Sequence, residues 1–222
     1  AVYGPRPLSL SRVREGKHDR ALIRCEYSMA AFSTGERKSH TKNRRAMEIA
    51  HLISETFESV VQVDLFPQSE IAIYIQVLQA DGGQLSASIN AATLALVDAG
   101  VPMRDLVCAC AGGFLQDTAV LDLNFVESAG ASSCTLPLAL LPHSDRVVTL
   151  QLESRLPLDR FEEVLHLTML GCKRIAQVLA QELKEPGSTY QPSRHPRPSL
   201  LEEIEHEAAA TAAAAAEMET SV

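Results

Sequence analysis

The chain has 222 residues, of which 46% are hydrophobic, so it is long and apolar enough for one domain of about 180 residues and a tail. Its five cysteines are odd in number and lie mostly in apolar runs, which argues against a disulfide-built secreted protein and predicts reduced thiols. The formal net charge is −8, but residues 1–45 hold 11 Lys and Arg against 4 Asp and Glu. This basic start predicts a surface that attracts a polyanion, the alternative being scattered charge on a solvated loop.

The apolar pattern predicts strands and helices throughout the first 185 residues. The predicted elements in chain order are strand 21–27, a helix capped by Asn43 and continuing to 61, strand 71–77, helix 86–99, strands 106–111, 119–123, 136–141 and 147–152, and helix 161–184. Strands and helices mixed in this order predict an α+β (mixed α/β) domain of sheet and helices. No apolar run of about 18 residues occurs, so no membrane span and no membrane partner are expected.

Composition changes after the last predicted helix. Four prolines among polar residues predict a linker from Pro186 to Pro198, and the remaining residues are rich in alanine and glutamate. We therefore expect a folded domain over 1–185 and a Pro-rich linker with an acidic, Ala-rich tail over 186–222. The tail is expected to be solvated or weakly helical, with partner binding as the alternative.

The stretch Val77-Leu78-Gln79-Ala80-Asp81-Gly82-Gly83 is the most informative in the chain. It follows an alternating strand, breaks at Asp-Gly-Gly and precedes a helix of small residues. A strand that turns into a helix in this way can hold an anion, because the first backbone N–H groups of the helix lack partners.

That stretch, together with residues 25–38 and 90–110, resembles the RNase PH family of phosphorolytic 3′-to-5′ exoribonucleases. The resemblance covers Ala1 to about Leu183 and implies a duplicated βαβ-type domain that assembles into six-domain rings with RNA in the central pore. Family members have about 50 residues before the strand that starts here at Ala1, so the first strands are expected to be missing and sheet edges to be open. A fragment and a shortened gene model both fit this expectation.

The resemblance also implies where phosphorolysis would occur. In the active family pattern, Asp-Gly-Gly is followed by a small hydroxyl residue and by an arginine that grips phosphate; here these positions are Gln84 and Leu85. Leucine has neither a donor nor a charge. Loss of such a charge-assisted contact is expected to slow the reaction by about 10² to 10³.

The family's second signature is a pair of acids near the end of a short strand. Asp122 matches the first acid, whereas Ser128 stands where the second is usually aspartate. Glu127 is adjacent, but in an extended segment its side chain would point to the opposite face, so it is a poor substitute unless the backbone forms a turn there. Asp122 is therefore expected to be vestigial, and no catalytic residue and no metal site are expected.

The resemblance assigns the remaining contacts to cations and glycines. Arg44 and Arg45 match a pair that contacts RNA and phosphate at the start of the first long helix, with Gly82 and Gly83 supplying backbone donors. Arg37 and Lys38 are implied as pore-facing RNA contacts. Solvated side chains are the alternative for all four cations.

The combined interpretation is a non-catalytic, RNA-binding ring subunit of the RNA exosome that threads RNA to an associated nuclease. The implied partners are RNA, other RNase PH-like ring subunits, cap subunits with RNA-binding domains, and a hydrolytic nuclease, in the nucleus, nucleolus and cytoplasm. No cofactor is expected. The alternative is an active phosphorolytic exoribonuclease, which would use inorganic phosphate and Mg²⁺.

Overall fold

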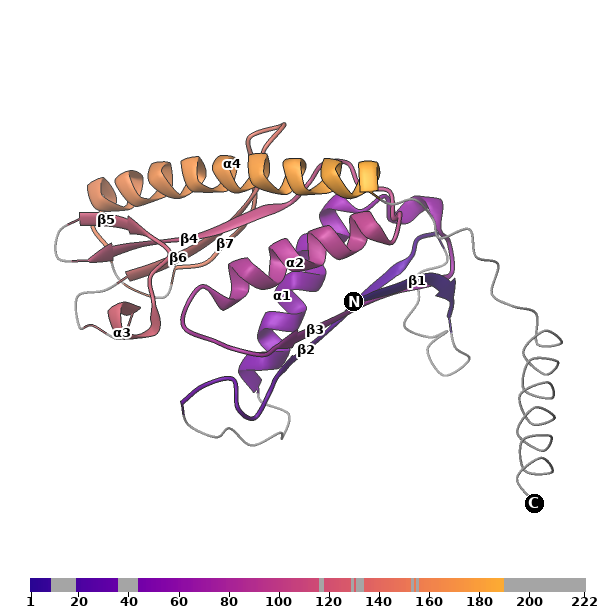
Figure 1. Ribbon diagram of the computed structural model, residues 1–222, viewed down its shortest axis with the longest axis horizontal. Coiled ribbons are helices and arrows are strands. Elements are labelled where there is room, and N and C mark those ends of the chain that lie inside the picture. The colour runs from indigo at the N-terminus through magenta and orange to yellow at the C-terminus, as the bar shows by residue number, and fades with distance from the viewer. Residues whose placement is uncertain are drawn as a thin grey trace, which may run out of the picture. The chain divides into compact units, whose positions relative to one another are not determined.

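The computed structural model describes residues 1–8, 19–35, 44–115, 118–128, 130, 134–152, 154 and 156–189. In this part of the chain, helices combine with two sheets, which confirms the predicted α+β class (Figure 1). The elements are β1 (Val2–Pro7), β2 (Leu22–Met29), α1 (Arg44–Val60), the 3-10 helix η1 (Val63–Leu65), β3 (Ser69–Val77), α2 (Gln84–Asp98), β4 (Cys108–Leu115), β5 (Thr118–Leu121), α3 (Phe125–Ser128), β6 (Cys134–Leu141), β7 (Arg146–Leu150) and α4 (Leu158–Thr189).

Every predicted strand and helix is present, with ends that differ by a few residues. The elements that the apolar pattern did not predict are β1, η1 and α3. Helices as short as η1 and α3 contain too few residues to show a helical period, so sequence periodicity does not reveal them. The predicted cap Asn43 and the predicted tail lie outside the described residues.

The first sheet has the strand order β1-β3-β2, with β3 antiparallel to β1 and parallel to β2. Ile71, Ala72 and Ile73 in β3 are each at most 1% exposed, so both faces are covered in the first half of the strand, although the alternating pattern predicts half-burial. Because β2 and β3 are parallel, they finish at the same edge, with Met29 opposite Val77. The segments that follow the two strands therefore begin side by side.

Helix α1 covers this sheet with an apolar stripe. Ile53, Phe57 and Val60 are each at most 1% exposed and belong to the main core cluster. Met47, which belongs to the same apolar pattern in the sequence, is 56% exposed. It lies about 120° around the helix from Ile53, because six residues make one and two-thirds turns.

The second sheet is antiparallel in the order β5-β4-β6-β7, and α4 runs along it (Figure 1). Val164 and Cys172 of α4 are fully buried in the two clusters that join the helix to β4 and β6. Gly112 allows the helix to approach closely, since a Cβ at this position would be 1.8 Å from Thr168 Oγ1. Position 112 therefore requires glycine because of the close helix–sheet contact, and not because of a turn.

Helix α2 is fixed to β4 by side-chain hydrogen bonds. Asn90 Nδ2 donates to the Ala109 carbonyl, and the Ala109 N–H donates to Asn90 Oδ1, each at 2.8 Å. The buried Thr93 hydroxyl lies 2.8 Å from the Val107 carbonyl. These bonds pair backbone groups at the start of β4 with side chains from the middle of α2 and fix the helix against the strand.

Helix α4 continues to Thr189, so the prediction that it ends near Lys184 is wrong. A proline removes one backbone donor and bends a helix without always ending it, and the helical backbone passes through Pro186. Contacts between Cα atoms divide the chain into units of residues 1–181 and 182–222. None of the described helices combines the length and the apolar character that crossing a bilayer requires.

The buried thiols predict a stability change at high pH. Burial raises the pKa of Cys172 from its ordinary value of 9.0 to about 12, and that of Cys108 to about 11. The unfolded chain releases these protons first, so the free energy of unfolding should be unaffected by the thiols below pH 9 and should fall as the pH rises from 9 towards 12. Urea titrations across this pH range test this, and Cys172→Ala should show a shallower fall than the parent chain; an equal fall would contradict the assignment.

Candidate functional site

The Asp81-Gly82-Gly83 turn joins β3 to α2, as predicted from the sequence. Gly82 and Gly83 have φ angles of +104° and +56°, which side chains disfavour. A Cβ on Gly82 would lie 2.2 Å from the Leu123 carbonyl oxygen, so the turn packs directly on the backbone that follows β5. The Phe125 N–H donates to Asp81 Oδ1 at 3.3 Å and ties the two segments together.

The start of α2 retains features of an anion site. Gly83 occupies the N-cap position and no side chain caps the helix, so its first N–H groups are available to a ligand. Ser86 is only 6% exposed, and its Oγ has no hydrogen-bond partner among the described residues. A buried hydroxyl in this state can donate to a bound anion.

Leu85 weakens this site. Its side chain is half-buried and packs against the main core cluster. Residues 81–98, which form the turn and α2, contain no Lys or Arg. The arrangement therefore offers backbone donors to an anion without a cation from the same helix to offset its charge.

Asp122, which the resemblance matched to the first acid of the second signature, faces the start of α2. Its Oδ1 lies 2.8 Å from the position of a Cβ on Gly83, and its N–H donates to the Ala111 carbonyl at 2.8 Å. Its φ of +57° is unusual for a residue other than glycine. An anion at this turn would therefore meet a carboxylate.

The segment around Glu127 differs from the expected extended conformation. It forms the single-turn helix α3, in which the Asn124 N–H donates to Glu127 Oε2 and the Glu127 N–H donates to Asn124 Oδ1, both at 2.9 Å. This capping box engages the carboxylate that could have replaced the missing acid. Ser128 Oγ donates to the Phe125 carbonyl at 3.0 Å, so this hydroxyl also bonds within α3. The short-range Asn-x-x-Glu pattern is the signal that could have predicted this turn.

Arg44 and Arg45 lie in the first turn of α1, as expected. Arg44 Nε contacts Glu48 Oε1 at 3.1 Å, and the Arg44 side chain is 89% exposed. Burial raises the pKa of Tyr27, and the positive charge of Arg45 partly opposes that rise, which places Arg45 near the end of β2. The positions of Arg37 and Lys38 are outside the described residues.

Comparison with known proteins decides the family. The models of the 3′ exoribonuclease family, domain 1 and domain 2, match residues 1–102 and 105–170. Over 186 residues the chain is 48% identical to the exosome complex component RRP41 homolog of Arabidopsis thaliana, spanning 83% of this chain and 76% of that protein. The chain belongs to the RNase PH family. It is also 45% identical over 185 residues to exosome complex component RRP41 of Homo sapiens, covering 83% of this chain and 75% of the human protein.

Solved structures support the RNase PH fold. The crystal structure of rice (Oryza sativa) Rrp46 superposes with a TM-score of 0.70 at 23% identity, covering 82% of this chain and 81% of the rice chain. The Archaeoglobus fulgidus exosome with RNA bound to the active site gives 0.58 at 17% identity, covering 72% of this chain and 71% of that chain. At these identities the superpositions establish the fold alone.

Two further features of this RNase PH-family chain were not predicted. The Tyr27 hydroxyl and the Ser33 hydroxyl are buried and have no hydrogen-bond partner among the described residues. Tyr27 lies near the end of β2, where the charge of Arg45 acts on it, and Ser33 follows that strand. The alternation Ile23, Cys25, Tyr27 indicates which side chains share a face, but pattern alone does not reveal an unpaired hydroxyl.

Proposed function

We propose that this chain is an RNA-binding ring subunit of the RNA exosome that does not catalyse phosphorolysis. In this role it would support 3′-to-5′ processing and decay of RNA, including ribosomal RNA, in the nucleus, nucleolus and cytoplasm. Its partners would be other RNase PH-like ring subunits, cap subunits and an associated hydrolytic nuclease. The main support for the absence of phosphorolysis is Leu85. Its side chain packs on the core at the position where the active family pattern has an arginine.

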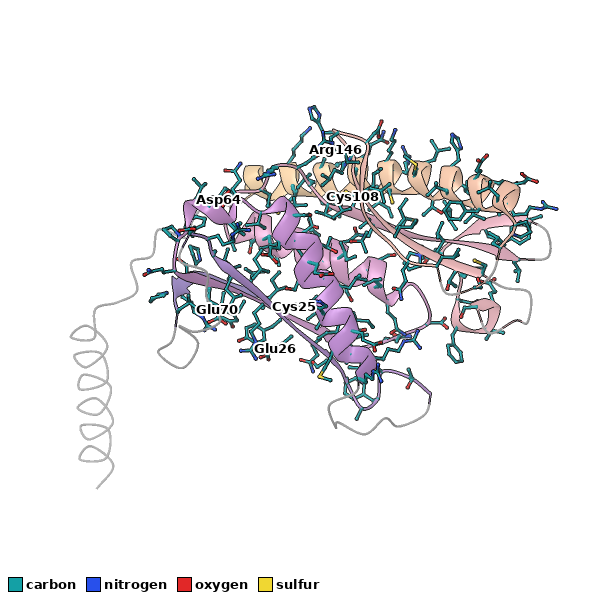
Figure 2. All side chains as sticks on the ribbon, turned by 180° about the vertical axis from the view of Figure 1, so that it is seen from behind. Cys25, Glu26, Asp64, Glu70, Cys108 and Arg146 are labelled. Atoms are coloured by element: carbon teal, nitrogen blue, oxygen red, sulfur yellow. The ribbon has the colours of Figure 1, made fainter. Side chains whose placement is uncertain are left out.

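Local charge supports the same proposal. Between Arg45 and Arg146 the sequence has one basic residue, Arg104, and twelve acidic residues. Figure 2 shows Arg146 far from the first turn of α1, on the side of α4 and β7. Phosphate attacking an RNA phosphodiester brings two anions together, and a turn with Asp81 and Asp122 would repel both of them.

Phosphate-dependent RNA cleavage tests the proposal. The assembled ring, without its hydrolytic nuclease, is incubated with poly(A) and inorganic phosphate, and nucleoside diphosphates are measured. We expect RNA binding but no diphosphate release. Release that requires phosphate and disappears in Asp122→Ala would establish the alternative, an active phosphorolytic exoribonuclease. A ring that binds no single-stranded RNA would contradict the RNA-binding role.

A further inference from the structure

Two large apolar side chains are exposed to solvent at the end of the first sheet where the parallel strands β2 and β3 finish. Phe32 is 76% exposed and follows β2, and Leu78 is 63% exposed and follows β3. Both belong to described backbone at the edge where the two parallel strands finish. Ligands of α/β proteins commonly bind at the carboxyl ends of parallel strands, where the following segments converge.

The backbone at this edge is fixed by hydrogen bonds. The Ser33 N–H donates to the Ala30 carbonyl at 3.0 Å, which closes a turn with Phe32 at its third position. The Ala80 N–H donates to the Ser33 carbonyl at 2.8 Å, and the Ala30 N–H donates to the Val77 carbonyl at 2.9 Å. The turn that carries Phe32 is therefore bonded to the segment that contains Leu78 and leads into the Asp-Gly-Gly turn.

Cations lie at the same end of the sheet. Helix α1 begins at Arg44 beside the end at which β2 and β3 finish, and the two views agree on this (Figures 1 and 2). The charge of Arg45 acts on Tyr27, two residues before the last residue of β2. An exposed aromatic ring at the same end of a sheet as guanidinium groups can bind single-stranded nucleic acid, because bases stack on the ring while phosphates contact the cations.

We propose that Phe32, with Leu78 in the adjoining segment, forms a stacking platform for a base of single-stranded RNA whose phosphates contact Arg44 and Arg45. The inference rests on the proposed RNA-binding function and specifies where a base is held. A protein partner would also suit these side chains, because Phe and Arg are both enriched at protein interfaces, so the experiment below separates the two occupants. Stacking does not depend on base identity, so the platform would accept any sequence.

The platform is tested by comparing the binding of a strand that has bases with the binding of a strand that has only the sugar-phosphate backbone. Binding of a single-stranded RNA, and of an abasic strand of equal length, is measured on rings that contain the parent chain, Phe32→Ala or Phe32→Trp. Phe32→Ala should weaken binding of the RNA by about 5- to 100-fold, leave binding of the abasic strand unchanged, and leave the salt dependence unchanged. Phe32→Trp should restore the affinity. Leu65→Ala, an exposed apolar residue in η1 before β3, is the matched control and should change nothing.

The outcomes separate this inference from the proposed function. If the parent ring binds RNA and Phe32→Ala binds it equally well, the platform is wrong and the RNA-binding role stands. If Phe32→Ala dissociates the ring, as measured by its mass in solution, Phe32 is a protein contact and the platform is wrong. If the parent ring binds no RNA, the proposed RNA-binding function is wrong, and the platform that rests on it is wrong as well.

Discussion

Gly82→Ala should lower the free energy of unfolding by about 3 kcal/mol, because the added methyl group would collide with backbone atoms. The added Cβ would lie 2.2 Å from the Leu123 carbonyl oxygen and 3.1 Å from the Asn124 Cα, both backbone atoms that cannot turn away. The φ of +104° adds conformational strain for any residue with a side chain. Urea denaturation of the parent and variant chains measures the difference.

A substitution at a second glycine separates the cost of backbone strain from the cost of the steric clash. Gly100 has a φ of +70°, but no atom lies within 4 Å of the position that a Cβ would take there, so Gly100→Ala should cost only the conformational strain, about 1 kcal/mol. If Gly82→Ala and Gly100→Ala destabilise the chain equally, the close contact between the Asp-Gly-Gly turn and Leu123 does not exist as described. A larger loss for Gly82→Ala supports the packing that positions Asp122 beside α2.

The regular elements were predictable because each presents a repeated pattern to a core. Ile71 and Ile73 alternate along β3, and Ile53, Phe57 and Val60 recur along one face of α1; all five are buried. Patterns of this kind report the local period, which is the main signal that a single sequence contains. The same signal did not indicate that the first half of β3 is covered on both faces, because strand order and neighbouring layers are long-range properties.

The candidate site was predictable in part. The resemblance singled out the two glycines and Asp122 in separate motifs, and the structure brings them together. The sequence did not predict that Leu85 packs on the core or that Glu127 closes a capping box, because both depend on contacts between segments or on a turn shorter than one helical period. The exposure of Phe32 is a tertiary property, and an aromatic residue in a turn gives no sign of it in the sequence.

Reversing the charge of both arginines at the start of α1 is the change expected to affect RNA binding most. In rings that contain Arg44→Glu with Arg45→Glu, the affinity for single-stranded RNA should fall by about 100-fold or more at moderate salt. The slope of log K against log salt should become shallower by about 1.4, since each lost phosphate contact on a single strand contributes about 0.7. Filter binding or fluorescence anisotropy at several salt concentrations measures both quantities.

Ring assembly should survive this double substitution. The new glutamate at position 44 would repel Glu48 one turn along, which costs a few tenths of a kcal/mol. Negative charge at a helix N-terminus is favourable and offsets that repulsion. Arg174→Glu, a charge reversal at an exposed position of α4, is the matched control and should leave RNA affinity unchanged. An equal loss in both variants would mean that overall charge, rather than the first turn of α1, holds the RNA; no loss in the double variant would exclude Arg44 and Arg45 from the RNA path.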